Sequence, residues 1–117
     1  MNAKHDRLLP LAPATLHILL ALAAEDLHGY GIMLEVLDQS EGRYRLGPGT
    51  LYDNLQRLMN QGLVEESGAR RNPDSRRRYY RLTAAGRRVL AAEIARLEEV
   101  VRKGKLHLAG ARPRRTS

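Results

Sequence analysis

The chain contains no cysteine, no tryptophan and no phenylalanine. The lack of cysteine excludes a disulfide framework, a thiolate metal site and a cysteine nucleophile. Because the five tyrosines are then the only large aromatic side chains, the core has to be built from aliphatic residues. Apolar residues still make up 43% of the 117 residues, which is enough for one folded domain.

The chain also lacks an apolar run long enough to span a membrane comfortably. Residues 8–24 carry no charge, and the Ala-Leu-Ala sequence at 21–23 resembles a signal-peptidase site. This stretch is interrupted by Pro10, Pro13 and His17. Pro13 suits the first position of a helix, where its missing N–H costs nothing. We therefore expect a core helix in a cytoplasmic protein. The alternative, a secretion signal, predicts a mature protein shorter by about two dozen residues.

Positive charge is in excess, with a formal net charge of +7. Residues 1–67 carry −4 and residues 82–101 are balanced, whereas residues 68–81 carry +5 and residues 102–117 carry +6. The basic charge is therefore confined to one internal segment and one tail. Such a concentration is typical of a surface that binds a polyanion, most often nucleic acid. For the tail, a solvated and disordered end stays open as an alternative, whereas for the internal segment we favour binding.

The spacing of apolar and turn residues predicts a mainly helical chain with a small β-hairpin. Helices are expected at 13–24, 30–39 and 48–61, and from Thr83 onwards; strands are expected at 63–67 and 78–82. Residues 43–46 alternate between polar and apolar side chains, which predicts either a very short strand or an extended lead-in to the next helix. In helix 13–24 we expect four side chains to face the core: Leu16, Leu19, Leu20 and Ala23.

Helix 48–61 has the clearest boundaries, with Pro48 at its start and Gly62 as its stop. Leu51, Leu55 and Leu58 form one apolar face. The opposite side is polar but nearly neutral, and it presents Gly49, Thr50, Tyr52, Asp53, Gln56, Arg57 and Asn60.

The last helix carries the repeat of a coiled-coil seam. Leu90, Ile94, Leu97 and Val101 follow one another at spacings of four, three and four residues. Gly104 interrupts the register before Leu108.

Helices 30–39 and 48–61 have the arrangement of a helix-turn-helix, and the hairpin after them makes a winged helix. We expect the second helix to enter the major groove of double-stranded DNA and the Arg-rich wing at 68–81 to contact phosphates. The wing arginines are Arg70, Arg71, Arg76, Arg77 and Arg78. The predicted organisation is a flexible arm (1–10), a DNA-binding domain (11–83), a dimerisation helix (84–109) and a disordered basic tail (110–117).

Four ordered motifs resemble the PadR family of transcriptional regulators. Residues 27–32 (LHGYGI) are similar to the family's LHGYEI-type segment, and residues 47–52 (GPGTLY) to its SPGTLY signature. Leu55, Leu58 and residues 62–64 match the continuation of that signature, and residues 77–83 with Gly86 resemble its RRYYxLTxxG segment. The resemblance covers about residues 11–90.

The resemblance implies a cytoplasmic, homodimeric winged-helix regulator, commonly a repressor, that binds a pseudo-palindromic operator. It implies that Pro48, Gly49, Thr50 and Tyr52 form the DNA-facing start of the recognition helix. It also implies that Arg76, Arg77 and Arg78 lie at the wing and that the helix from Leu90 to Val101 is the dimer element.

Two departures from the family pattern bear on the site. Gly47 stands where the family usually has serine, and it offers no side-chain acceptor to cap the helix. The second departure is Asp53, whose carboxylate would repel a phosphate. Three other roles stay open for it: accepting a hydrogen bond from a cytosine amino group, interacting with the dipole at the helix start, or pairing with Arg57. The lack of Trp and Phe argues against a site that sandwiches a flat ligand, and whether a small-molecule effector binds stays open.

Nothing in the sequence indicates an enzyme, a metal site or a cofactor. No set of His, Asp and Glu residues has metal-ligand spacing, and no phosphate-binding loop is present. The alternative to DNA binding is a winged helix that binds protein through its hydrophobic seam, with incidental basic segments.

Overall fold

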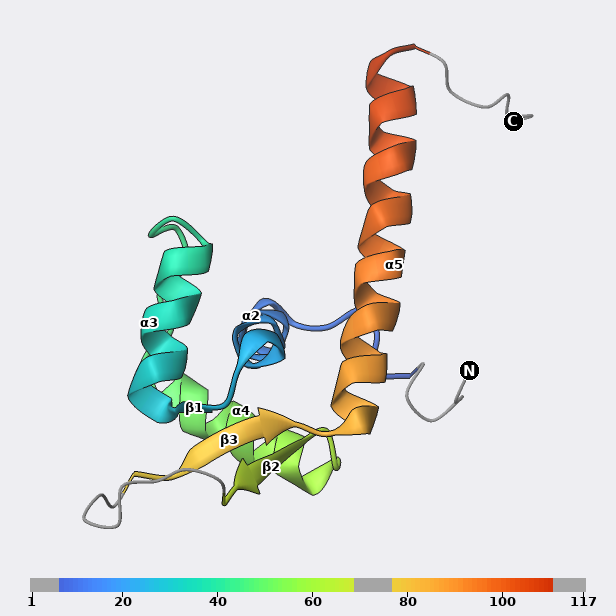
Figure 1. Ribbon diagram of the computed structural model, residues 1–117. Coiled ribbons are helices and arrows are strands. Elements are labelled where there is room, and N and C mark those ends of the chain that lie inside the picture. The colour runs from blue at the N-terminus through green and yellow to red at the C-terminus, as the bar shows by residue number, and fades with distance from the viewer. Residues whose placement is uncertain (1–6, 69–76, 111–117) are drawn as a thin grey trace.

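The computed structural model describes residues 7–68 and 77–110 of the chain (Figure 1). Within these residues the elements are α2 (Pro13–Ala24), β1 (Leu27–His28), α3 (Gly29–Gln39), α4 (Pro48–Asn60), β2 (Val64–Ser67), β3 (Tyr79–Leu82) and α5 (Ala84–Leu108). The predicted order of helices and strands is confirmed. Arg70, Arg71 and Arg76 of the predicted wing and residues 111–117 of the predicted tail lie outside the described residues.

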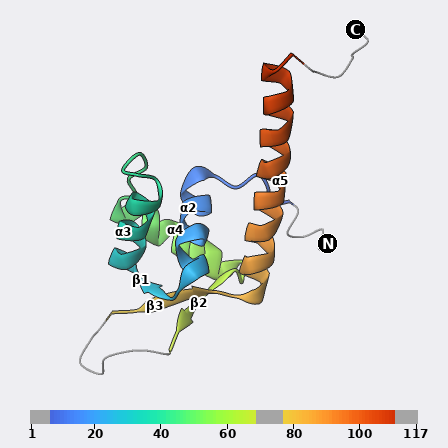
Figure 2. The ribbon, with the colours of Figure 1, turned by 45° about the horizontal axis from the view of Figure 1, so that its top comes forward.

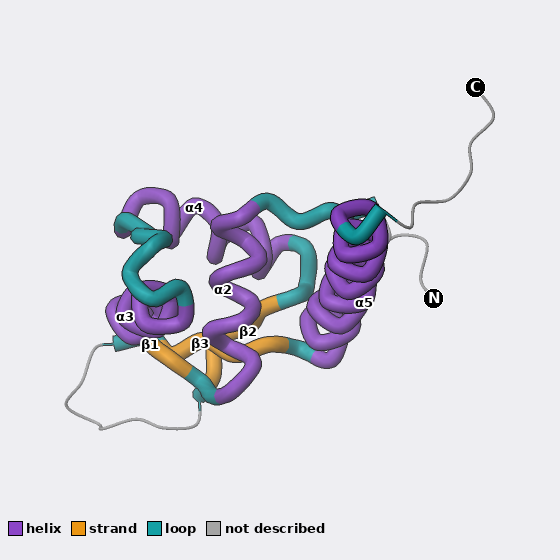
Figure 3. The backbone as a smooth tube through the Cα atoms, turned by 90° about the horizontal axis from the view of Figure 1, so that it is seen from above, coloured by secondary structure: helices purple, strands orange, loops and turns teal. Residues whose placement is uncertain are grey.

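Helix α2 lies at the centre of the domain, between α3, α4 and α5 and against the sheet (Figure 3). The prediction that four side chains of this helix face the core is confirmed: Leu19 is buried, and Leu16, Leu20 and Ala23 pack against the core. The helix also buries three residues that the prediction did not include, namely Ile18, Ala21 and Leu22. Since α2 has neighbours on several sides, its sequence is apolar nearly all round and does not mark a single stripe.

The sheet has three strands, one more than the predicted hairpin. Its order is β1-β3-β2 with antiparallel pairs, in which Leu27 lies opposite Tyr80 and Val64 opposite Leu82. The sequence predicts no strand at residues 27–28. A two-residue strand has no periodicity of its own, and it is the pairing with β3 that creates it. Through β1 the hairpin is tied directly to the start of α3.

The helix-turn-helix is formed by α3 and α4. Helix α3 begins at a side-chain cap, because the Gly31 N–H donates to Nδ1 of His28 at 3.0 Å. The N-cap of α4, Gly47, makes no side-chain cap bond, as its sequence predicts. Between the helices, residues 43–46 form an extended lead-in and no strand.

Helix α5 begins at the predicted cap, where the Gly86 N–H donates to Oγ1 of Thr83. It continues through Gly104, which interrupts the predicted seam without ending the helix. Its first turns pack on the domain, whereas its second half extends beyond it (Figures 1 and 2). No helix in the described part of the chain is both long and apolar enough to cross a membrane.

The segment before α2 is held against α5 by Glu93, which is 1% exposed. Its carboxylate accepts from the Leu11 backbone N–H at 3.1 Å and from Nε and Nη2 of Arg96 at 2.7 and 3.0 Å. Leu8 and Leu9, which we expected in a flexible arm, pack against the core. The bonds from Arg96, with smaller help from Leu11, hold the pKa of Glu93 below the ordinary glutamate range.

Replacing Glu93 with glutamine is expected to lower the free energy of unfolding by about 2 kcal/mol, because charge-assisted bonds in a buried site are lost. Since the folded-state pKa is depressed, the stabilisation is present above the ordinary pKa and is lost as the pH falls through the lowered one. The E93Q loss should therefore shrink on acidification. The control is E99Q, which breaks the exposed pair with Arg102 on the same helix and should cost much less, because exposed ion pairs contribute little. Equal losses for both variants in urea denaturation would contradict this role.

Gly86, in the last predicted motif, is required by close packing between α5 and the turn before β2. A Cβ atom at Gly86 would overlap the carbonyl oxygen of Leu63, which itself accepts from the Thr83 N–H. Gly86→Ala should therefore lower stability by about 1–3 kcal/mol, the usual cost of overpacking. Gly104→Ala is the matched control: it adds a methyl group in open space within the same helix and should raise stability by up to about 1 kcal/mol. A neutral effect of Gly86→Ala in thermal denaturation would refute the packing argument.

Candidate nucleic-acid interface

The outer face of α4 is the polar surface that the sequence predicts. Leu51, Leu55 and Leu58 are buried in the core. The exposed residues of this helix are Pro48, Gly49, Thr50, Tyr52, Asp53, Gln56, Arg57 and Asn60. Seven of the predicted DNA-binding residues therefore lie together on one accessible helix face.

Asn54 holds α4 in place from its inner side. Its Oδ1 accepts from the hydroxyl of Thr15 at 2.8 Å, and its Nδ2 donates to the carbonyl of Thr50 at 2.9 Å. Arg57 donates to the same Oδ1 at 3.3 Å, so in this structure Arg57 bonds to Asn54 and not to Asp53. Sequence reasoning did not single out Asn54, whose polar type gave no sign that it would be buried.

Gln56 and Asn60 lie one turn apart on the exposed face. The Gln56 amide donates to Oδ1 of Asn60 at 3.2 Å. A surface bond of this kind costs little to break, so both amides can turn towards another partner. Amide groups are suited to base edges because they donate and accept side by side.

Three of the four family-like motifs meet at one open pocket of about 410 Å³ beside α4. It is lined by the start of α3, by Tyr52 of α4 and by the base of the wing: His28, Gly29, Tyr30, Tyr52, Arg77, Arg78 and Tyr80. A Cβ atom at Gly29 would overlap the hydroxyl of Tyr52. The glycine of the first motif therefore makes room for the tyrosine of the second.

His28 has two roles in this pocket. Its Nδ1 caps α3, and its Nε2 lies 2.9 Å from Nη1 of Arg77; the imidazole also packs edge-on against Tyr79, with ring centroids 5.2 Å apart. Burial, followed by the positive charge of Arg77, lowers the pKa of His28, so the ring is neutral at pH 7. The sequence does not show the contact of His28 with the wing, because only the pairing of β1 with β3 creates it.

The base of the wing carries the other charged side chains of the hairpin. Arg78 lies 3.6 Å from Glu66, and Arg81 donates to Glu65 at 2.9 Å; both pairs are well exposed. Exposed pairs of this kind contribute little, so Arg78 can exchange its partner for another anion. Tyr79 and Tyr80 lie on opposite faces of β3: Tyr79 is partly buried and Tyr80 is buried, and burial raises the pKa of the Tyr80 phenol.

The second half of α5 presents an apolar surface. Ile94 is 40% exposed and Val101 53% exposed, and Leu97 is partly buried. Val100 is exposed at the edge of this surface, whereas Leu106 lies on the opposite side of the helix. Leu90, the first residue of the predicted seam, is 5% exposed and lies in the core of its own chain, so the accessible part of the seam begins at Ile94.

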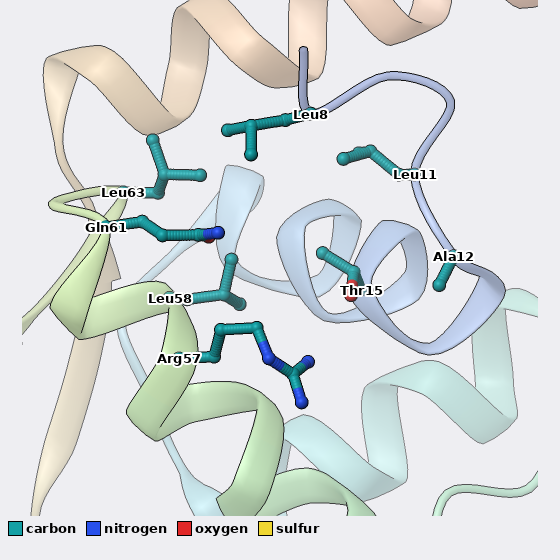
Figure 4. A pocket seen from close by; sticks show the side chains of 8 residues that line it. All are labelled: Leu8, Leu11, Ala12, Thr15, Arg57, Leu58, Gln61 and Leu63. Atoms are coloured by element: carbon teal, nitrogen blue, oxygen red, sulfur yellow. The ribbon is translucent and has the colours of Figure 1, made fainter. Parts of the chain in front are cut away.

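A second, smaller cavity of about 150 Å³ lies between the N-terminal segment, α2 and the end of α4 (Figure 4). Four leucines and Ala12 form the apolar part of its wall, and Thr15, Arg57 and Gln61 provide the polar groups. Pockets for small molecules commonly have volumes of about 300 Å³ or more. We therefore assign no ligand to this cavity.

The sequence model of the family described as "Transcriptional regulator PadR-like family" matches residues 18–92. The chain belongs to this family. Its members are transcriptional regulators and not enzymes. The PadR-like chain is 41% identical over 103 residues to the transcriptional regulator Rv3488 of Mycobacterium tuberculosis, a match that covers 85% of this chain and 92% of that protein.

Solved structures have the same PadR-like fold. A PadR family transcription regulator from hypervirulent Clostridium difficile R20291 is 26% identical, with a TM-score of 0.62 over 83% of this chain and 97% of that one. Bacillus subtilis PadR, crystallised in complex with operator DNA, is 20% identical, with a TM-score of 0.62 over 73% of this chain and 48% of that one. Because the identity to Bacillus subtilis PadR is only 20%, this second comparison shows a common fold and nothing more.

Proposed function

We propose that this PadR-like regulator is a homodimeric repressor that binds a pseudo-palindromic operator in double-stranded DNA. The observation that supports the proposal most strongly is the exposed polar face of α4 beside the arginines at the base of the wing. A single helix of this size fits the major groove, and an adjacent basic hairpin suits the phosphates. The related fold of Bacillus subtilis PadR, crystallised with operator DNA, supports the same arrangement.

In this proposal the face of α4 and the arginines of the wing have different roles in DNA binding. The face from Thr50 to Gln56 discriminates between base sequences, with Gln56 one turn deeper along the helix than Tyr52. The arginines of the wing supply affinity that does not depend on sequence. Asp53 either accepts from a cytosine amino group or lies against the dipole of the helix start.

The apolar surface of α5 supports a homodimer in which two copies of α4 meet the two halves of one operator. A two-fold arrangement gives half-sites about one turn of DNA apart, or a multiple of it. Ile94, Leu97 and Val101 form the proposed contact between the copies.

The proposal is tested by selecting genomic fragments with the purified protein. We expect the bound fragments to share a motif whose two halves are inverted repeats, centred about 10–10.5 base pairs apart or a multiple of this. A bound pool with no common motif would contradict sequence-specific binding. A motif without symmetry would contradict the dimeric arrangement while leaving DNA binding intact.

A further inference from the structure

The pocket at the start of α3 brings hydrogen-bond donors together from three separate elements. Arg77 and Arg78 come from the base of the wing, Tyr52 comes from α4, and His28 lies at the junction of β1 and α3. Glu66 is the acidic group near them; it is exposed and pairs with Arg78 at 3.6 Å.

The proton of His28 can be placed from its hydrogen bonds. Because Nδ1 accepts from the Gly31 N–H, the neutral ring must carry its proton on Nε2. Nη1 of Arg77, which always bears protons, lies 2.9 Å from this Nε2. With this tautomer the Nε2–H of His28 and the Nη1–H of Arg77 face each other donor to donor, an unfavourable contact. An oxyanion that enters beside the two nitrogens accepts from both and relieves it.

The local field at this point favours an anion. The first backbone N–H groups of α3 lie beside the pocket, and the first turn of this helix carries no acidic residue. The charges of Arg77 and Arg78 add to this field. An oxyanion that displaces Glu66 from Arg78 loses only a weak, exposed pair.

We propose that this pocket holds one phosphate of the DNA backbone, with His28 Nε2–H, Arg77 and the Tyr52 hydroxyl as its donors and Arg78 as a further cation. The inference rests on the proposed DNA binding and gives it a defined anchor. One phosphate clamped between the start of α3, the recognition helix and the wing fixes the register of α4 in the groove, as phosphate contacts do. His28 would then be a DNA-binding residue as well as a helix cap.

The test separates the two roles of His28 by His28→Asn. Asparagine is a good N-cap, so the melting temperature should stay near that of the unchanged protein. Its shorter side chain cannot reach the phosphate, and we expect DNA affinity to fall about tenfold for operator and random duplexes alike, in proportion to a lost bond of about 1.4 kcal/mol. Because a neutral donor releases no counterion, the slope of log K against log salt should stay unchanged.

Arg77→Ala should instead lower both the affinity and the salt slope, the latter by about one unit. The matched control is Arg43→Ala, which removes the same charge from the exposed turn at the far end of α3 and should change neither. Tyr52→Phe keeps the ring and removes the hydroxyl, and should reduce affinity several-fold. Wild-type affinity in both His28→Asn and Tyr52→Phe, each with an unchanged melting temperature, would overturn the proposal.

A second measurement uses inorganic phosphate alone. In ¹⁵N spectra of the unchanged protein, added phosphate should shift the His28 Nε2 resonance, and Arg77→Ala should weaken the shift. A phosphate shift without any DNA binding would mean that the pocket takes a free phosphate and that the proposed function fails. DNA binding that is insensitive to His28→Asn, together with no phosphate shift, would mean that only the pocket assignment fails.

Discussion

Replacing Leu97 with aspartate is expected to convert the proposed homodimer into a folded monomer. Leu97 lies between Ile94 and Val101 on the part of α5 that extends beyond the domain, so the charge would enter the centre of the proposed contact between two copies. An unpaired charge in an apolar interface costs several kcal/mol. The fold should survive, because the core is completed by residues up to Leu90.

The loss of the dimer should also weaken operator binding. A dimer engages two half-sites at once, and linkage of this kind contributes about 10²–10⁴ to the overall affinity. Leu97→Asp should therefore reduce operator affinity at least about a hundredfold. Sedimentation velocity measures the mass and circular dichroism the helical content.

Ala95→Asp is the matched control for this variant. Ala95 is exposed on the side of α5 away from the seam, so the same added charge should leave the dimer intact. If Leu97→Asp sediments like the unchanged dimer, α5 is not the main interface. If Ala95→Asp dissociates as well, the seam has been placed on the wrong face.

The second large effect is expected for the double variant Arg77→Ala/Arg78→Ala. Both side chains line the pocket beside α4 at the base of the wing. Removing two phosphate contacts should lower DNA affinity about a hundredfold near physiological salt, since a hydrogen bond to a charged group contributes about 1.5–3 kcal/mol. The slope of log K against log salt should fall by about two units.

A winged helix that serves only to bind protein predicts no such change. The control Arg43→Ala/Arg102→Ala removes two positive charges from the turn after α3 and from the outer part of α5, and should leave both affinity and slope nearly unchanged. Equal losses in the two double variants would show that net charge, and not the wing base, governs binding.

The features of this fold that the sequence predicts best are those set by local signals, such as helical periodicity and helix caps. Periodic leucines place the buried face of α4, and Thr83 places the start of α5, because helix caps and helical stripes are local signals. The exposed polar face of α4 follows from the same stripe. The four motifs lead to the PadR-like family, and the match over residues 18–92 confirms it.

The remaining features depend on contacts between distant residues. The strand β1 exists only by pairing with β3, and the contact of His28 with Arg77 joins residues 49 positions apart. Leu90 belongs to the heptad repeat in the sequence, yet in the structure it is buried in the core of its own chain. Heptad spacing alone does not show whether a residue packs against its own domain or against another chain. From the sequence alone Glu93 would be taken for a surface residue. In the structure its carboxylate is buried and accepts from Arg96 and from the Leu11 N–H.

The most direct test of the account is a binding measurement on two DNA fragments of equal length. One contains the promoter region of the protein's own gene and the other the same bases in shuffled order, and fluorescence anisotropy is recorded at two salt concentrations. We predict tighter binding to the promoter, by at least about 10³-fold, and weaker binding to both fragments at higher salt. Equal affinity for the two fragments, or binding that does not respond to salt, would contradict sequence-specific recognition by α4 and the wing.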